Sequence, residues 1–170
     1  MPGRRLVAGP ERVLAFFGIR AGQAVLEVGA GTGFYSVEAA RRVGASGLLV
    51  CLDVQTKMLE RARARLEEAG LAARFVRADA AKMPLQSGSF DQVFLITVLG
   101  EIPDQPSALA EIRRVLRPGG RLSVSEQFPD PDFVTPGTLR RQLRAAGFSE
   151  IWTRGWLFYT STWSAPSAAL

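Results

Sequence analysis

Three glycines at every second position follow a short apolar run that carries a single acid. The acid is Glu27, and the glycines are Gly29, Gly31 and Gly33. An apolar run bounded by glycine is typical of a buried parallel strand, and helical spacing begins at Phe34. Glycines at such a turn let the backbone approach a ligand closely, and the first N–H groups of the helix point at that ligand. The pattern therefore predicts a ligand-binding turn; a tight turn without a ligand is the alternative.

The residues beside the glycines indicate which kind of ligand fits. A carboxylate at Glu27 would repel a pyrophosphate and attract a ligand that carries positive charge. The dinucleotide fingerprint also requires glycine where this chain has Phe34. Both observations disfavour a nucleotide-binding oxidoreductase, which remains the rival enzyme class.

A second acid, Asp53, follows the next apolar run, twenty residues after Gly33. An acid at the end of the second strand of a nucleotide-type fold can accept hydrogen bonds from ribose hydroxyls. The same residue type also caps helices, so a purely structural role for Asp53 stays open.

The composition excludes several kinds of chemistry. The chain has 170 residues and no histidine. The commonest general base and metal ligand is therefore missing, which rules out His/Cys zinc sites and a Ser-His-Asp triad. The single cysteine, Cys51, lies in an apolar run and is expected to be a buried side chain. We expect no metal site.

The net charge of +5 comes mainly from arginines spread over several expected helices. Solvated outer helix faces explain this pattern. A nucleic-acid surface is less favoured because no basic run is interleaved with aromatic residues. No apolar run reaches the ~18 residues of a membrane span, and the run after Arg4 and Arg5 is too short for a signal peptide. We therefore expect a cytoplasmic protein without a nucleic-acid or membrane partner.

Strand and helix patterns alternate along nearly the whole chain. Strands are expected at residues 24–28, 48–52, 74–77, 92–97 and 121–125, with a closing hairpin at 148–153 and 156–162. Helices are expected at residues 10–17, 34–43, 55–69, 105–116 and 137–146. The expected fold class is α/β: a doubly wound, mostly parallel, seven-stranded sheet with helices on both faces and an antiparallel last strand. The ligand crevice of such a sheet lies at the carboxyl ends of its strands, where the glycines stand.

The glycine-rich stretch resembles motif I of the class I S-adenosylmethionine-dependent methyltransferases, whose cofactor carries a sulfonium and an amino group. The resemblance continues in a consistent order over roughly residues 10–163. Phe90 and Asp91 resemble the fourth motif of the family, and the turns at 116–120 and 145–148 are recurrent features of it. The chain is similar in particular to the small ubiquinone/menaquinone-type subgroup. This resemblance implies one Rossmann-like methyltransferase domain over residues 1–170.

The resemblance further implies S-adenosyl-L-methionine as the cofactor. In this family an acid at the position of Asp79 pairs with the adenine amino group. Met58 would face the adenine or ribose, with packing in the core as its alternative. The residues expected to bind the cofactor are Glu27, Gly29, Ala30, Gly31, Gly33, Asp53, Val54, Met58, Asp79, Ala80 and Thr97.

Two residues are candidates for a role in catalysis. Methyl transfer from a sulfonium depends mainly on positioning in a dry pocket, and it needs a base only when the acceptor is protonated. Because the chain has no histidine, Glu101 is the candidate base; a solvated acid beside the next helix is its alternative. Tyr35 is expected either to line the pocket or to pack beside it, and Glu126 and Tyr159 are weaker candidates.

The acceptor is expected to be a small organic molecule with an apolar or aromatic body. The expected pocket walls are Leu99, Ile102 and the loop at 128–133, with Trp156 and Tyr159 either there, in the core or at a homodimer contact. Members of the subgroup commonly read Leu-His-His-Ile-Pro-Asp where residues 99–104 of this chain have no histidine. Quinone precursors are therefore disfavoured as substrates. A cofactor-binding subunit that needs a partner, or an RNA or protein methyltransferase, is the alternative.

Overall fold

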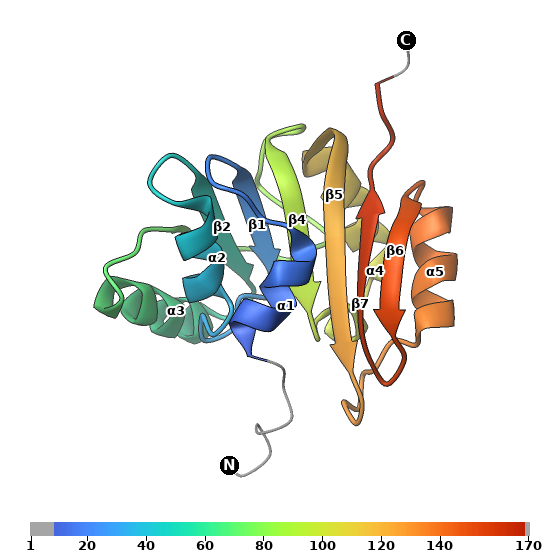
Figure 1. Ribbon diagram of the computed structural model, residues 1–170, viewed down its shortest axis with the longest axis horizontal. Coiled ribbons are helices and arrows are strands. Elements are labelled where there is room, and N and C mark those ends of the chain that lie inside the picture. The colour runs from blue at the N-terminus through green and yellow to red at the C-terminus, as the bar shows by residue number, and fades with distance from the viewer. Residues whose placement is uncertain (1–8, 169–170) are drawn as a thin grey trace.

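The computed structural model describes residues 9–168, which form a sheet with helices around it (Figure 1). The strands are β1 (Ala24–Val28), β2 (Leu48–Asp53), β3 (Arg74–Arg77), β4 (Phe90–Ile96), β5 (Leu116–Gln127), β6 (Ser149–Gly155) and β7 (Phe158–Ser164). Their order in the sheet is β3-β2-β1-β4-β5-β7-β6. Neighbouring strands pair in parallel, except that β7 runs antiparallel to both β5 and β6. The expected fold class is confirmed; the expectations for Arg4 and Arg5 lie outside the described residues.

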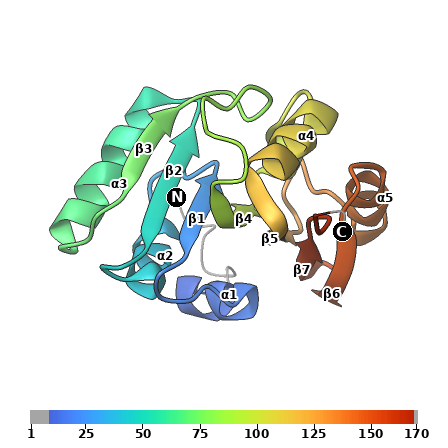
Figure 2. The same cartoon turned by 90° about the horizontal axis from the view of Figure 1, so that it is seen from above.

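Helices cover both faces of the sheet (Figure 2). One layer holds α1 (Pro10–Phe17), α2 (Ser36–Val43) and α3 (Thr56–Glu68), and the other holds α4 (Gln105–Val115) and α5 (Pro136–Ala145). Each layer closes its own apolar core against the sheet. Because both faces are covered, the central strands are apolar almost throughout rather than alternating, as is typical of parallel sheets.

The parallel strands all end at one edge of the sheet, the lower edge in Figure 1. There β1 lies between β2 and β4, so the strand order reverses beside it. Ligands of doubly wound folds bind outside this reversal point because the loops from the two sides diverge and leave a crevice. The loop that follows β1 contains the three glycines, so the predicted placement of the glycines is confirmed.

Most boundaries differ from the prediction by one or two residues, and the start of β5 differs by five; two of the differences have a clear cause. Helix α2 begins at Ser36 rather than Phe34 because a turn, closed by a 3.0 Å hydrogen bond from the Gly33 N–H to the Ala30 carbonyl, comes first. Strand β5 is longer at both ends than the predicted 121–125. Its first residue, Leu116, pairs with Phe90 before a bulge, and its far end pairs with β7.

The described residues contain no helix that combines the length and apolar character needed to cross a membrane. Cys51 is fully buried, as its apolar neighbours predicted. The C-terminal hairpin supplies two large core side chains, Tyr159 and Trp163, neither of which is exposed. The hydroxyl of Tyr159 donates a 2.7 Å hydrogen bond to the carbonyl of Val134, so this aromatic packs in the core rather than facing a ligand.

Candidate active site

The loop after β1 owes its path to glycine. The φ angles are +76° at Gly29, +53° at Gly31 and +77° at Gly33, in the left-handed region that residues with a Cβ rarely adopt. The N–H groups of Gly29 and Ala30 both donate to the carbonyl of Leu52 on β2, over 2.8 and 3.1 Å. The alternating glycine spacing is therefore a requirement of the backbone at this turn.

The three glycines differ in what lies beside them. A Cβ at Gly29 would stand 2.5 Å from a methyl group of Val98, and one at Gly33 would stand 2.8 Å from the Cα of Ala62 in α3. A Cβ at Gly31 would meet no atom within 4 Å. Gly29 and Gly33 thus allow the loop to pack against its neighbours, whereas Gly31 keeps the space in front of the loop free.

A cavity of about 550 Å³ opens in front of this loop. Its volume lies in the range typical of small-molecule sites. Loops that follow β1, β2, β3 and β4 contribute to its walls, so residues far apart in the sequence meet there. The lining includes these predicted site residues: Gly29, Ala30, Gly31, Tyr35, Asp53, Val54, Met58, Asp79, Ala80, Thr97 and Glu101.

Two predicted cofactor residues lie outside the cavity lining. Gly33 faces α3, as described above, and Glu27 is buried beneath the loop with only 3% of its surface exposed. The Glu27 carboxylate accepts a hydrogen bond from the hydroxyl of Ser36, and the thiol of Cys51 lies 3.9 Å from it. Burial raises the pKa of Glu27 to about 8, more than its hydrogen bonds lower it. Direct contact between Glu27 and a cofactor stays a prediction.

Asp53 accepts hydrogen bonds from two of the segments that line the cavity. One carboxylate oxygen accepts from the Gly31 N–H over 2.9 Å, and the other accepts from the Gln55 N–H over 2.9 Å. The N-cap of α3 is Gln55, so Asp53 is not the cap of that helix. An ionised carboxylate has about four lone-pair positions, so Asp53 can still accept hydrogen bonds from a ligand. Asp79 is similar, since one of its oxygens accepts from the Ala81 N–H over 2.8 Å.

Thr97, at the end of β4, has a strained backbone. Its φ is +53°, and among the described residues it is the one non-glycine residue with positive φ. A β-branched residue is rare in this conformation, and strain of this kind is typical of functional sites. Two hydrogen bonds hold Thr97 there: its N–H donates to Ser125 over 2.8 Å, and its hydroxyl donates to the carbonyl of Ile96 over 2.8 Å. The sequence pattern gave no sign of this strain.

Glu101 reaches the cavity from a short 3₁₀ helix, η2 (Leu99–Glu101), that follows β4. Partial burial raises its pKa, and the nearby carboxylates of Asp130 and Asp132 raise it further. A raised pKa makes a carboxylate a better proton acceptor near neutral pH. Glu101 thus lines the cavity and has a raised pKa, and its role as a base stays a prediction.

Aromatic side chains flank the cavity beside the glycine loop. Tyr35 lines it, as predicted, and its ring makes an edge contact with Phe34 at 5.1 Å between centroids. Phe34 also lines the cavity and is 42% exposed. The sequence assigned Phe34 only to the helix start, yet its position directly after the last glycine of the loop was the signal that it would face the ligand side.

Of the expected acceptor walls, the loop at 128–133 contributes no residue to the cavity lining. Ile102 lines the cavity, but Leu99 is fully buried in the core, and Trp156 is 74% exposed at the hairpin turn. Gln127, at the end of β5, lines the cavity and was not predicted. The predicted strand ended two residues too early to place Gln127 at the edge of the sheet, where its neighbours in β4 also end.

A comparison with protein families identifies the chain. Residues 25–120 match the family model described as a methyltransferase domain. Two relatives are the ubiquinone/menaquinone biosynthesis C-methyltransferases UbiE of Idiomarina loihiensis and Hahella chejuensis, which are 37% and 41% identical over 111 residues and 64% of this chain. The matched region spans 44% and 45% of those two proteins, so the chain corresponds to less than half of their length.

Solved structures give the same fold. The crystal structure of a SAM-dependent methyltransferase from Aquifex aeolicus superposes with a TM-score of 0.88 and 24% sequence identity, covering 97% of this chain and 94% of that one. This likeness extends through the C-terminal hairpin, which the family model does not include. The glycine loop, the acids at the strand ends and the seven-stranded sheet thus agree with the sequence comparison: this chain belongs to the methyltransferase domain family and resembles the UbiE methyltransferases.

Proposed function

We propose that this chain binds S-adenosylmethionine in the cavity beside the glycine loop and transfers its methyl group to a small organic acceptor. The observation that carries the proposal is the glycine loop itself. Gly31 leaves the space before it open, and the carboxylate of Asp53 stands 2.9 Å from the Gly31 N–H. Backbone and carboxylate together form a cradle that a bulkier residue would fill. Family membership supports this proposal.

The residues of the cavity fit the proposed cofactor. Asp53 would accept from the ribose hydroxyls and Asp79 from the adenine amino group, since each carboxylate keeps lone pairs beyond its backbone hydrogen bonds. Met58 and Val54, from the start of α3 and the turn before it, offer apolar surface for the adenine ring. Ala80 and Thr97 also line the cavity, from the segments that follow β3 and β4. The buried Glu27 would act through Ser36 and the loop rather than by direct contact.

S-adenosylmethionine, when bound, supplies an electrophilic methyl group on a sulfonium. The protein's part is then to orient the acceptor, exclude water and take up a proton where the acceptor must lose one. We assign this proton uptake to the carboxylate of Glu101, which lies at the end of the cavity formed by η2. Tyr35 and Ile102 would hold the acceptor body, since both offer ring or alkyl surface in the lining.

The acceptor of this chain need not be that of its relatives. The two UbiE proteins are named for ubiquinone and menaquinone biosynthesis, and this chain covers less than half of each. Residues 99–104 form η2 and the turn after it, and they contribute three side chains to the lining. We therefore propose a small acceptor other than a quinone precursor.

Turnover tests this proposal against its alternative, a binding subunit that requires a partner. Purified protein is incubated with methyl-labelled S-adenosylmethionine and a panel of amines, phenols, carboxylic acids and RNA. The proposal expects the label on a small molecule and release of the demethylated cofactor. A binding subunit would bind the cofactor without turnover on any acceptor, and transfer of the label to RNA would favour a nucleic-acid methyltransferase.

A further inference from the structure

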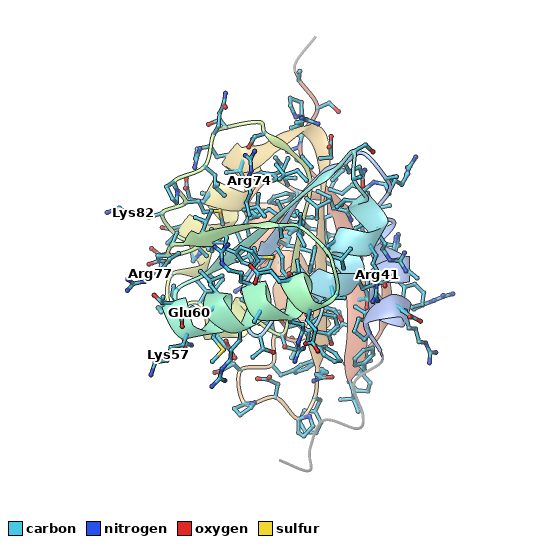
Figure 3. The ribbon with its side chains drawn as sticks, turned by 90° about the vertical axis from the view of Figure 1, so that its left-hand side faces the viewer. Arg41, Lys57, Glu60, Arg74, Arg77 and Lys82 are labelled. Carbon is cyan, nitrogen blue, oxygen red and sulfur yellow. The ribbon has the colours of Figure 1, made fainter. Side chains whose placement is uncertain are left out.

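The charged part of the cavity lining is acidic. Asp53, Asp79 and Glu101 line it, and no Lys or Arg between residues 9 and 168 does so, although the chain has 21 Lys and Arg against 16 Asp and Glu. The basic side chains lie elsewhere: Figure 3 shows Lys57, Arg77 and Lys82 pointing outward near α3 and β3. The interior of the site thus has the opposite charge to the protein as a whole.

Asp53 and Asp79 are occupied by backbone N–H groups and by the proposed cofactor, but Glu101 belongs to the acceptor end. Asp130 and Asp132 lie beside it, in the loop that follows β5. This loop packs directly on η2: a Cβ at Gly100 would stand 1.7 Å from the carbonyl oxygen of Asp132. The close approach fixes the two aspartates next to the Glu101 side of the cavity.

A third acid, Glu126, lies buried behind the same end. It is 1% exposed, and its Oε1 atom has no hydrogen-bond partner in the described part of the chain. The carboxyl is near enough to Asp130 and Glu101 that both raise its pKa, which burial already lifts to about 8. The next residue, Gln127, lines the cavity. Backbone N–H groups of Val134 and Leu99 donate to the Glu126 carboxyl, so among the described residues Oε1 alone is left without a partner at this end of the site.

Four acids outside the site are neutralised by arginine. Glu38, Glu111, Asp91 and Glu150 each pair with an arginine within 4.0 Å. Among the described residues no such pair involves Glu101, which lines the cavity, or Asp130 and Asp132 beside it. Uncompensated carboxylates that are held together repel one another, and a bound cation relieves that repulsion.

We propose that the acceptor is a protonated amine, bound with its ammonium group toward Glu101 and its apolar body along Ile102 and the neighbouring lining. The inference rests on the proposed methyl transfer and narrows its substrate class. An acceptor with a carboxylate or phosphate near its reacting atom would meet several negative charges and no cation in the described part of the site.

The reaction of an amine also gives Glu101 a defined role. The carboxylate takes one proton from the ammonium group and becomes a neutral acid, which leaves the nitrogen lone pair free. That pair forms the new C–N bond as the C–S bond of the donor breaks, and the electrons of the broken bond remain on sulfur. The product is the N-methylammonium ion, and the proton on Glu101 leaves to solvent. The step needs no other reactant.

A matched set of probes tests the charge preference: 2-phenylethylamine, 2-phenylethanol and 3-phenylpropanoate. Their binding to protein saturated with S-adenosylhomocysteine is measured by ligand-detected NMR at low and at about 150 mM salt. The amine should bind at least about tenfold more tightly than the carboxylate, as expected for one charge-assisted hydrogen bond. In Glu101→Gln the affinity for the amine should fall about tenfold or more, while that for the alcohol stays within about twofold.

The control variant is Glu60→Gln, which removes the same charge from the exposed face of α3 (Figure 3). It should leave all three affinities unchanged. Equal affinities for amine and carboxylate, a preference for the carboxylate, or equal losses in the two variants would overturn the inference while leaving methyl transfer intact. Failure of the protein to bind S-adenosylhomocysteine at all would overturn the proposed function, and this inference with it.

Discussion

Alanine at Gly31 and at Gly33 should have different consequences, although the two glycines are two residues apart in one loop. Both adopt left-handed φ angles, so alanine at either position costs about 1–2 kcal/mol. At Gly33 the new methyl group would also stand 2.8 Å from the Cα of Ala62, against the 3.4–4 Å of ordinary contact. Overpacking of this kind adds about 1–3 kcal/mol.

The expected loss of stability is therefore about 2–5 kcal/mol for Gly33→Ala and about 1–2 kcal/mol for Gly31→Ala. For a chain of this length 1 kcal/mol corresponds to about 2–4 °C in Tm, so melting should fall by about 10 °C and about 4 °C respectively. Differential scanning calorimetry without ligand measures both values.

Cofactor affinity should show the reverse order. The methyl group at Gly31 would enter the open cavity, whereas the one at Gly33 would face α3. Titration with S-adenosylmethionine, well below either Tm, should give at least about a tenfold loss for Gly31→Ala and less than about threefold for Gly33→Ala. Equal losses of stability together with equal losses of affinity would refute the assignment of Gly31 to the ligand and Gly33 to packing.

Three further results are expected. Because burial raises the pKa of Glu27 from 4.5 to about 8, the unfolded chain loses this proton first, so its contribution to stability should be full below pH 4.5 and disappear as the pH rises to about 8. At 1.36 kcal/mol per pKa unit the free energy of unfolding changes by at most about 4–5 kcal/mol over this pH range. Urea unfolding between pH 5 and 9 should show this change in the wild-type protein but not in Glu27→Gln. The same pH dependence in both proteins would contradict the prediction. Thr97→Asn should raise Tm by about 2–4 °C, since asparagine tolerates the left-handed conformation better, whereas Thr97→Val should not; a lower Tm for the asparagine variant would exclude strain. Asp53→Ala should weaken S-adenosylmethionine binding about ten- to a hundredfold in calorimetry, and unchanged binding would remove Asp53 from the site.

The parts of the fold that could be predicted are those encoded by local spacing. The turn needs left-handed φ angles at three alternating positions, and glycine occupies all three, so the sequence pattern predicts the turn directly. Asp53 ends β2 and Asp79 comes two residues after the end of β3, and parallel strands bring such positions to one edge. The same reasoning placed Glu101 after β4. These predictions needed only strand ends and the topology of an α/β sheet.

The parts that escaped prediction depend on contacts between distant segments. The burial of Glu27 was not predicted: strand alternation puts it on the same face as Val25, beneath α2 and its Ser36, while its contact with the cofactor stays a prediction. The alternation of side chains along β1, in which Glu27 shares a face with Val25, was the signal that could have predicted its burial beneath α2. The strained Thr97 is held by Ser125 of β5, and Gly100 packs against Asp132; both contacts join segments that are distant in the sequence, for which no local pattern exists.

Calorimetric titration of the purified protein with S-adenosylmethionine tests the central claim most directly. We expect one site per chain with a Kd of about 1 mM or tighter, which is the weak end of the common KM range of about 1 μM to 1 mM. S-adenosylhomocysteine should bind with comparable affinity. NAD should give no heat under the same conditions, and Gly31→Val, whose side chain would enter the cavity, should not bind the cofactor. Absence of binding to the wild-type protein, or undiminished binding to Gly31→Val, would contradict the account.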